Sequence, residues 1–127
     1  MARVLVVDDD EDIRELVTVR LQGAGHAVAA AENGPAALAL VAERGDPEVA
    51  VIDVTMPGMD GFELLAALRA RPGLAGLPAV FLSARVGEED VARGRTVAAA
   101  YLTKPFVASA LLAAIDRALT PPAATAW

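Results

Sequence analysis

The hydrophobic positions of this chain form short, continuous runs, and four of these runs end on polar residues. Residues 4–7 lead into Asp8, Asp9 and Asp10, 49–52 into Asp53, 79–82 into Ser83, and 100–103 into Lys104. Continuous apolar runs of this length are typical of strands buried on both faces, and therefore of a parallel sheet. Parallel strands end on one shared edge, where open sheets bind ligands. The pattern therefore predicts that these polar groups gather in one place.

Helical patterns alternate with the strands. Ile13, Leu16, Val17 and Leu21 fall on one helical face, and Asp10 or Asp12 is placed to cap the start of that helix. The other predicted elements are a short strand over 27–31, helices over 35–44, 62–71 and 88–95, and a clearly amphipathic helix over 108–119. Strands that alternate with helices predict right-handed βαβ units, with helices on both faces of the sheet.

Composition narrows the class of protein. The 127 residues suffice for one domain, and the net charge of −6 argues against a basic face for DNA. Aromatic residues make up only 4% of the chain, which disfavours a stacking platform for single strands. The chain has no cysteine, no signal-peptide pattern and no apolar run that approaches a membrane span. We therefore expect a soluble, cytoplasmic domain.

The acidic strand ends point to metal chemistry. If the strands that precede Asp8, Asp9 and Asp53 are neighbours, these carboxylates lie within a few ångströms of one another. Like charges at that distance raise each other's pKa, and a bound cation keeps them ionised most readily. Carboxylate and carbonyl oxygens suit Mg²⁺. Ser83 and Lys104 would hold the oxygens of a phosphoryl group while a carboxylate attacks it.

Four motifs, in this order, resemble those of response-regulator receiver domains of two-component signalling. They are Val6-Val7-Asp8-Asp9, Asp53 with Met56-Pro57-Gly58-Met59-Asp60-Gly61, Ser83-Ala84-Arg85, and Tyr101-Leu102-Thr103-Lys104-Pro105-Phe106. The resemblance implies an α/β, flavodoxin-like, doubly wound (βα)5 fold with a parallel sheet of order 2-1-3-4-5. It also implies a receiver domain over residues 1–120 and a flexible tail over 121–127.

The resemblance assigns a role to each residue of the site. Asp53 is the phosphoacceptor, and its donor is a sensor histidine kinase or a phosphotransfer protein. Ser83 and Lys104 bind the phosphoryl oxygens. The metal is Mg²⁺, with Mn²⁺ or Ca²⁺ as possible substitutes, and its implied ligands are Asp8, Asp9, Asp53 and the backbone carbonyl of Thr55. The peptide bond between Lys104 and Pro105 is expected to be cis, as in the family.

The resemblance also implies a switch. Phosphorylation draws Ser83 toward the phosphoryl group, Tyr101 turns inward, and the surface of the fourth helix, fifth strand and fifth helix changes to control an unknown downstream effector. The chain is then a signalling phosphoacceptor that assists its own phosphorylation and dephosphorylation, rather than an enzyme. We expect a monomer or a phosphorylation-dependent homodimer, with no direct contact to nucleic acid or membrane.

One stretch departs from the family pattern. Receivers usually carry a glycine shortly before the tyrosine of the fifth strand, where this chain has Val97-Ala98-Ala99-Ala100. Without glycine, the fourth helix lacks an easy C-cap. We therefore expect this helix to be short, shifted or frayed.

Other interpretations stay open. The Asp8 to Asp10 cluster can be a plain helix cap. His26, which follows Gly25 in a glycine-flanked turn, is expected to be a surface residue. A degenerate receiver would act as an interaction module without phosphate. A phosphatase of the haloacid-dehalogenase type would need a second acid two residues after Asp53, where this chain has Thr55. Whether the chain stands alone or is part of a longer protein stays undecided.

Overall fold

The computed structural model describes residues 2–84 and 87–120 and contains one parallel sheet of order β2-β1-β3-β4-β5. The tail predicted over 121–127 lies outside the described residues. The strands are β1 (Arg3–Val7), β2 (Ala27–Ala31), β3 (Val49–Asp53), β4 (Ala79–Ser83) and β5 (Ala100–Thr103). The helices are α1 (Glu11–Gly23), α2 (Gly34–Arg44), α3 (Gly61–Arg69), α4 (Glu88–Val97) and α5 (Ala108–Leu119). The predicted fold class and strand order are confirmed.

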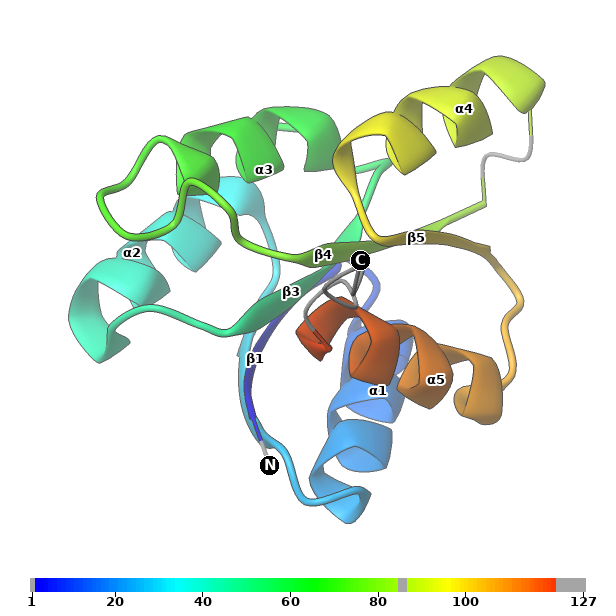
Figure 1. The fold of residues 1–127 in the computed structure, drawn as a ribbon, viewed down its shortest axis with the longest axis horizontal. Coiled ribbons are helices and arrows are strands. Elements are labelled where there is room, and N and C mark those ends of the chain that lie inside the picture. Colours follow the sequence, from blue (N-terminus) through cyan, green and yellow to red (C-terminus); the bar gives the residue numbers. More distant parts are fainter. Residues whose placement is uncertain (1, 85–86, 121–127) are drawn as a thin grey trace, which may run out of the picture.

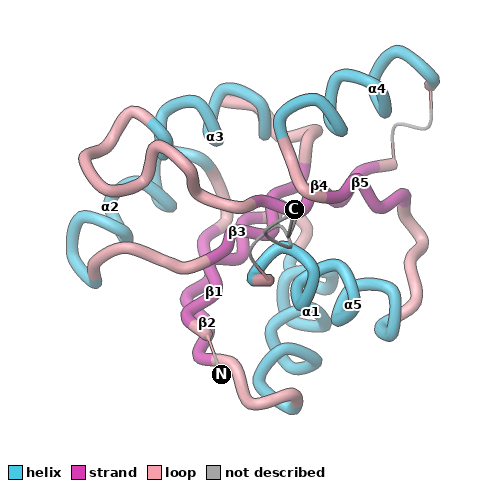
Figure 2. The backbone as a smooth tube through the Cα atoms, viewed as in Figure 1, coloured by secondary structure: helices cyan, strands magenta, loops and turns pink. Residues whose placement is uncertain are grey.

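Helices cover both faces of the sheet, with α1 and α5 on one face and α2, α3 and α4 on the other (Figures 1 and 2). Alternate residues of β1 divide between two cores, because Leu5 and Val7 pack toward α2 and α3, whereas Val4 and Val6 pack toward α1 and α5. Every residue of β3 and of β4 is buried. This double burial explains the continuous apolar runs in the sequence. No helix within the described ranges is both long and apolar enough to cross a membrane.

The start of α1 is fixed by one of the two predicted caps. Oδ1 of Asp10 accepts hydrogen bonds from the N–H groups of Asp12 and Ile13, at 2.9 and 3.3 Å. Asp10 is therefore the N-cap, and its carboxylate also lies favourably at the positive end of the helix dipole. The predicted apolar face of α1 is wrong at one position, because Leu16 is 43% exposed although Val17 and Leu21 are completely buried.

Two helices end at residues other than those predicted. The α3 helix ends at Arg69, two residues before the predicted end. The α4 helix runs for ten residues to Val97, two residues beyond the predicted end, so it is not shortened there; the alternatives of a shifted or frayed helix stay predictions. Ala98 follows in extended backbone with φ −127°, and its N–H donates to the carbonyl of Gly94 at 2.9 Å. A helix that leaves directly into extended chain needs no residue of positive φ.

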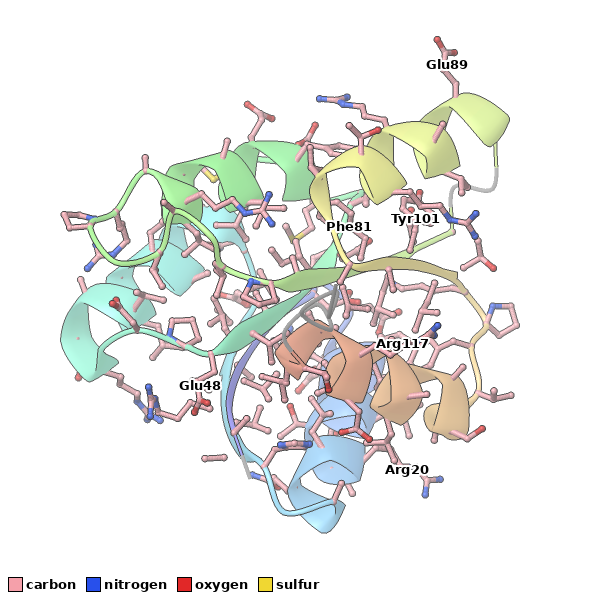
Figure 3. The ribbon with its side chains drawn as sticks, viewed as in Figure 1. Arg20, Glu48, Phe81, Glu89, Tyr101 and Arg117 are labelled. Carbon is pink, nitrogen blue, oxygen red and sulfur yellow. The ribbon has the colours of Figure 1, made fainter. Side chains whose placement is uncertain are left out.

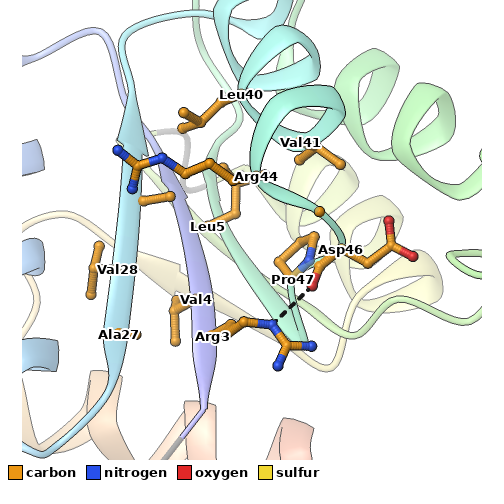
Figure 4. A pocket seen from close by; sticks show the side chains of 12 residues that line it. Arg3, Val4, Leu5, Ala27, Val28, Leu40, Val41, Arg44, Asp46 and Pro47 are labelled. Atoms are coloured by element: carbon orange, nitrogen blue, oxygen red, sulfur yellow. Dashed lines mark hydrogen bonds between the residues drawn. The ribbon is translucent and has the colours of Figure 1, made fainter.

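A hollow of about 170 Å³ lies between α2 and the amino-terminal halves of β1 and β2 (Figure 4). It is lined by Ala27 and Ala29 of β2 and by Leu40 and Arg44 of α2, among others. Alanine side chains on the strand fill little of the space beside the helix. The hollow is therefore a packing defect at the edge strand, at the end of the sheet away from the acidic strand ends.

Substitution of Ala29 with valine is expected to raise the free energy of unfolding by about 0.5–1 kcal/mol. Valine fills part of the hollow, and β-branched residues favour strands. Urea denaturation measures the change. Ala30→Val is the matched control, because Ala30 is exposed on the same strand and points to the opposite face. Equal stabilisation by both substitutions would show that strand propensity alone is responsible.

Candidate functional site

The strand order brings the polar strand ends together at the carboxyl edge of the sheet. Val7 pairs with Ile52, so the residues that follow β1 lie beside Asp53 at the end of β3. Asp53 pairs with Leu82, and Ser83 pairs with Thr103. Four strands therefore contribute side chains to one place, as the hydrophobic pattern predicted.

Three carboxylates converge at this edge. One oxygen of each of Asp8, Asp9 and Asp53 lies within 4.8 Å of the others. Asp8 is 1% exposed and Asp53 is 4% exposed, whereas Asp9 lies at the open rim. Oδ1 of Asp8 accepts from the N–H of Asp10 at 2.9 Å, and Oδ1 of Asp53 accepts from the N–H of Thr55 at 3.1 Å. These local turns orient the two buried carboxylates.

Lys104 supplies the positive charge of the cluster. Its Nζ lies 3.0 Å from Oδ2 of Asp8 and 3.4 Å from Oδ2 of Asp53. The N–H of Lys104 donates to the carbonyl of Ser83 at 2.8 Å, which ties the lysine to the end of β4. The Lys104–Pro105 peptide bond is cis, as the resemblance implied.

The cluster shifts the pKa of two of its members. Burial and the charge of Asp8 raise the pKa of Asp53 from its usual 3.8 to about 7, against the opposing effects of Lys104 and the Thr55 N–H. Burial by itself would lower the pKa of Lys104, but hydrogen bonding to Asp8 and the charges of Asp53 and Asp8 outweigh it and raise this pKa. Asp53 therefore stays protonated to a higher pH than an ordinary aspartate, and Lys104 stays protonated to a higher pH than an ordinary lysine.

The residues present fit a divalent cation. Three carboxylates face one ammonium, which leaves the site with excess negative charge. Oδ2 of Asp8 is buried, and the Lys104 ammonium lies 3.0 Å from it. One ammonium does not neutralise three neighbouring carboxylates, and buried charge that is not neutralised is costly. A set of hard oxygens of this kind suits Mg²⁺ better than a soft metal.

Gly61 allows α3 to begin directly against the end of β3. A Cβ at this position would lie 2.6 Å from the carbonyl oxygen of Asp53 and 2.8 Å from Cα of Val54. The N–H of Gly61 donates to the carbonyl of Val54 at 3.0 Å, and Asp60 and Glu63 form a capping box at the helix start. In the sequence, Gly61 stands out only as the last residue of the motif that follows Asp53. The close approach that requires glycine emerges only in three dimensions.

The other predicted site residues lie on strands that flank Asp53. Ser83 ends β4 and is completely buried. Tyr101 lies on β5, is 6% exposed, and packs its ring edge-on to that of Phe81 with centroids 6.2 Å apart. Thr55 follows the acidic strand end with its side chain exposed. The roles that the resemblance assigns to these three residues remain predictions.

Sequence reasoning missed Arg14. Its Nη1 donates to the backbone carbonyl of Asp8 at 2.9 Å. This hydrogen bond connects α1 to the turn that carries the acidic residues. An arginine in the first turns of a helix can reach back to the preceding strand, but its sequence position does not say which group it meets. His26 lies elsewhere, near the amino-terminal ends of the strands, where its half-buried Nδ1 accepts from the N–H of Ala2 at 3.1 Å. It is therefore less exposed than expected.

Comparison with known proteins agrees with this geometry. The family model described as "Response regulator receiver domain" matches residues 4–116. An uncharacterised 14.6 kDa protein of Leptolyngbya boryana is 47% identical over 80% of this chain and 78% of its own length. Response regulator PleD of Caulobacter vibrioides is 39% identical over 94% of this chain but only 26% of its own length. DNA-binding response regulator MtrA of Mycobacterium tuberculosis is 37% identical over 89% of this chain and 48% of its own length.

Solved structures show the same arrangement of elements. The chemotaxis protein CheY4 of Vibrio cholerae superimposes with a TM-score of 0.85 at 38% identity and covers 94% of this chain and 99% of its own. A response regulator from Chloroflexus aurantiacus gives a TM-score of 0.85 at 32% identity, over 93% of this chain and 97% of its own.

Proposed function

We propose, because the chain belongs to the response-regulator receiver family of two-component signalling, that Asp53 accepts a phosphoryl group from a histidine kinase or a phosphotransfer protein. The observation that carries this proposal is the convergence of Asp8, Asp9 and Asp53 on one another, with Lys104 bridging two of them. Mg²⁺ held by these carboxylates and the carbonyl of Thr55 would neutralise charge on the transferring group.

Asp53 acts as the nucleophile of the transfer. One of its oxygens forms a bond to phosphorus as the bond from phosphorus to the donor's imidazole nitrogen breaks, and the product is an acyl phosphate. The imidazole leaves and takes a proton from solvent. Only the ionised carboxylate attacks, so the raised pKa of Asp53 makes the neighbouring positive charge essential.

Lys104 and Ser83 receive the phosphoryl oxygens. The Lys104 ammonium already lies beside Oδ2 of Asp53, where new negative charge arrives. The Ser83 hydroxyl lies at the end of the adjacent strand and donates to a second oxygen. Donors fixed in place before the reaction stabilise developing charge without reorganisation.

The phosphorylated domain signals rather than turns over a substrate. The acyl phosphate stays attached to Asp53 until it is hydrolysed, and the domain assists both its formation and its loss. The surface made of α4, β5 and α5 controls the downstream effector, either as a monomer or as a phosphorylation-dependent homodimer. MtrA is a DNA-binding response regulator, and this chain spans about half of its length.

Intact-mass spectrometry after incubation with acetyl phosphate and Mg²⁺ tests the proposal. We expect the wild type to gain the mass of one phosphoryl group, and Asp53→Asn to gain none, because the amide is not a nucleophile. Asp116→Asn, which alters an exposed acid on α5, should retain the gain. An unchanged wild-type mass would favour a degenerate receiver, and an equal gain in Asp53→Asn would place the phosphoryl group elsewhere. Repeated hydrolysis of an aryl phosphate would instead support a phosphatase.

A further inference from the structure

The turn between β1 and α1 carries the exposed member of the acidic cluster. Asp8, Asp9 and Asp10 form the whole connection, and Asp9 lies at its centre with the side chain exposed. One carboxylate oxygen of Asp9 nevertheless lies within 4.8 Å of oxygens of Asp8 and Asp53. An exposed side chain is not held in such a place by packing, so the backbone of the turn has to direct it.

Hydrogen bonds hold both peptide groups that flank Asp9. The carbonyl of Asp8 and the N–H of Asp9 belong to one planar peptide group, and this carbonyl accepts from Nη1 of Arg14 at 2.9 Å. The next peptide group ends in the N–H of Asp10, which donates to Oδ1 of Asp8 at 2.9 Å. Two fixed planes leave the residue between them little choice of φ and ψ. Together they set the direction of the Asp9 side chain.

Arg14 supplies the one of these two contacts that comes from outside the turn. It lies half-buried on α1, where it lines an open depression with Ala31 of β2 and Leu40 of α2. Its own N–H donates to the carbonyl of Asp10 at 2.9 Å, so the first turn of the helix fixes its backbone. The N–H of Asp8 donates to the carbonyl of Ala31 at 3.2 Å. The arginine therefore joins a fixed helix start to a fixed strand end.

Neither helix stability nor charge pairing accounts for an arginine at this position. A cation in the first turns of a helix is opposed by the positive end of the helix dipole. Five acids occupy residues 8–12, yet within the described part of the chain the Arg14 guanidinium forms no ion pair and donates to a neutral carbonyl. Its charge also disfavours a cation bound nearby. The hydrogen bond to the turn is therefore the contact that favours arginine here.

We propose that Arg14 is a positioning residue for the divalent cation, because it holds the peptide group that directs the Asp9 carboxylate and so raises the affinity of the site in spite of its own charge. The inference rests on the proposed function, in which Asp9 is a ligand of Mg²⁺. Groups that orient a metal ligand without touching the metal typically contribute about 10–100-fold to affinity. Arg14 falls at the lower end of this range, because its charge acts in the opposite direction and other contacts orient Asp8 and Asp53.

Titration with Mn²⁺ alone, in which electron paramagnetic resonance measures the free ion, tests the proposal. Arg14→Met keeps an unbranched stem and a good helix propensity but removes both the charge and the donor. We expect it to bind Mn²⁺ about tenfold more weakly than the wild type. Loss of a positive charge by itself would tighten binding, and a purely structural role would lower stability to urea without weakening binding. An affinity equal to or higher than that of the wild type would overturn the proposal.

The matched control for charge is Arg20→Met. Arg20 lies on the same helix, is exposed, and extends away from the rest of the fold (Figure 3). This variant loses the same charge and the same kind of side chain as Arg14→Met. In about 0.15 M salt, which screens distant charges, it should bind Mn²⁺ as the wild type does. Weakening equal to that of Arg14→Met would contradict the positioning role.

Arg14→Lys tests rescue by a conservative change. Lysine keeps the charge, but its stem is shorter and ends in a compact ammonium instead of a planar fork. It should bind Mn²⁺ less tightly than the wild type and more tightly than Arg14→Met. If circular dichroism shows that Arg14→Met is unfolded, Arg14→Lys decides. An affinity below that of the wild type then supports the proposal, and an unchanged affinity contradicts it.

Phosphoryl gain on Asp53, measured by mass on the same preparations, keeps this inference separate from the proposed function. A wild type that binds Mn²⁺ more tightly than Arg14→Met but gains no phosphoryl group contradicts the proposed function and supports the positioning role. A wild type that gains the group while its affinity equals that of Arg14→Met supports the function and contradicts the role. A wild type that binds no Mn²⁺ contradicts both the role and the proposed metal site.

Discussion

Replacement of Lys104 with methionine is expected to slow phosphoryl acceptance by Asp53 about 100-fold, the usual cost of losing one preorganised donor at a developing charge. The ammonium lies 3.4 Å from Oδ2 of Asp53 and 3.0 Å from Oδ2 of Asp8. Its loss leaves two buried carboxylates facing each other, and it favours the protonated, unreactive form of Asp53. The time course of mass gain with acetyl phosphate measures the rate.

The same substitution should lower the free energy of unfolding by about 2 kcal/mol in metal-free buffer. Removing one partner of a buried ion pair strands the other charge, although partial exposure of the Lys104 side chain and protonation of Asp53 soften the loss. Added Mg²⁺ should recover much of this stability, because it replaces the missing positive charge. Urea denaturation with and without Mg²⁺ measures both quantities.

Lys104→Arg is the informative control for this prediction. Arginine keeps the positive charge, so most of the stability should return. Its guanidinium is planar and delocalised, however, and does not reproduce the compact charge of the ammonium. Phosphoryl acceptance should therefore recover only in part. If Lys104→Met accepts the phosphoryl group at the wild-type rate, the lysine has no part in the chemistry and the proposed roles must be reassigned.

Most of the site was predictable because it depends on strand ends. Continuous apolar runs fix the strands, parallel strands share an edge, and the residues that end them, such as Asp53 and Ser83, must then lie together. The runs alone do not say which strands are neighbours. The strand order that places Asp53 beside the end of β1 was implied by the resemblance.

The features that escaped prediction depend on contacts between elements. The hydrogen bond from Arg14 to the carbonyl of Asp8 depends on a side-chain conformation, and the exposure of Leu16 depends on how α1 packs against the rest of the fold. The missing glycine before β5 suggested a weak end to α4, but the chain leaves the helix in extended form and no left-handed residue is required.

In metal-free buffer the wild-type fold is expected to lose about 2 kcal/mol of unfolding free energy, relative to Asp53→Asn, as the pH rises from about 4 to above 7. The folded protein holds the Asp53 proton up to a pKa of about 7, whereas the unfolded chain releases it near 3.8. Between these values the folded state binds more protons, so its stability decreases as the pH rises. A shift of this size represents roughly 4 kcal/mol, and access of water at the Asp9 rim should halve it.

Comparison with Asp53→Asn removes the contributions of the titrating groups outside the cluster, because the amide has nearly the same shape and cannot ionise. Urea denaturation near pH 5 and near pH 8, about one to two units on either side of the Asp53 pKa, gives the difference between the two proteins. A difference that does not change with pH would show that Asp53 titrates normally and that the pocket does not oppose its charge. Mg²⁺ should stabilise the wild type more near pH 8 than near pH 5, because cation binding and proton binding compete for the same carboxylate.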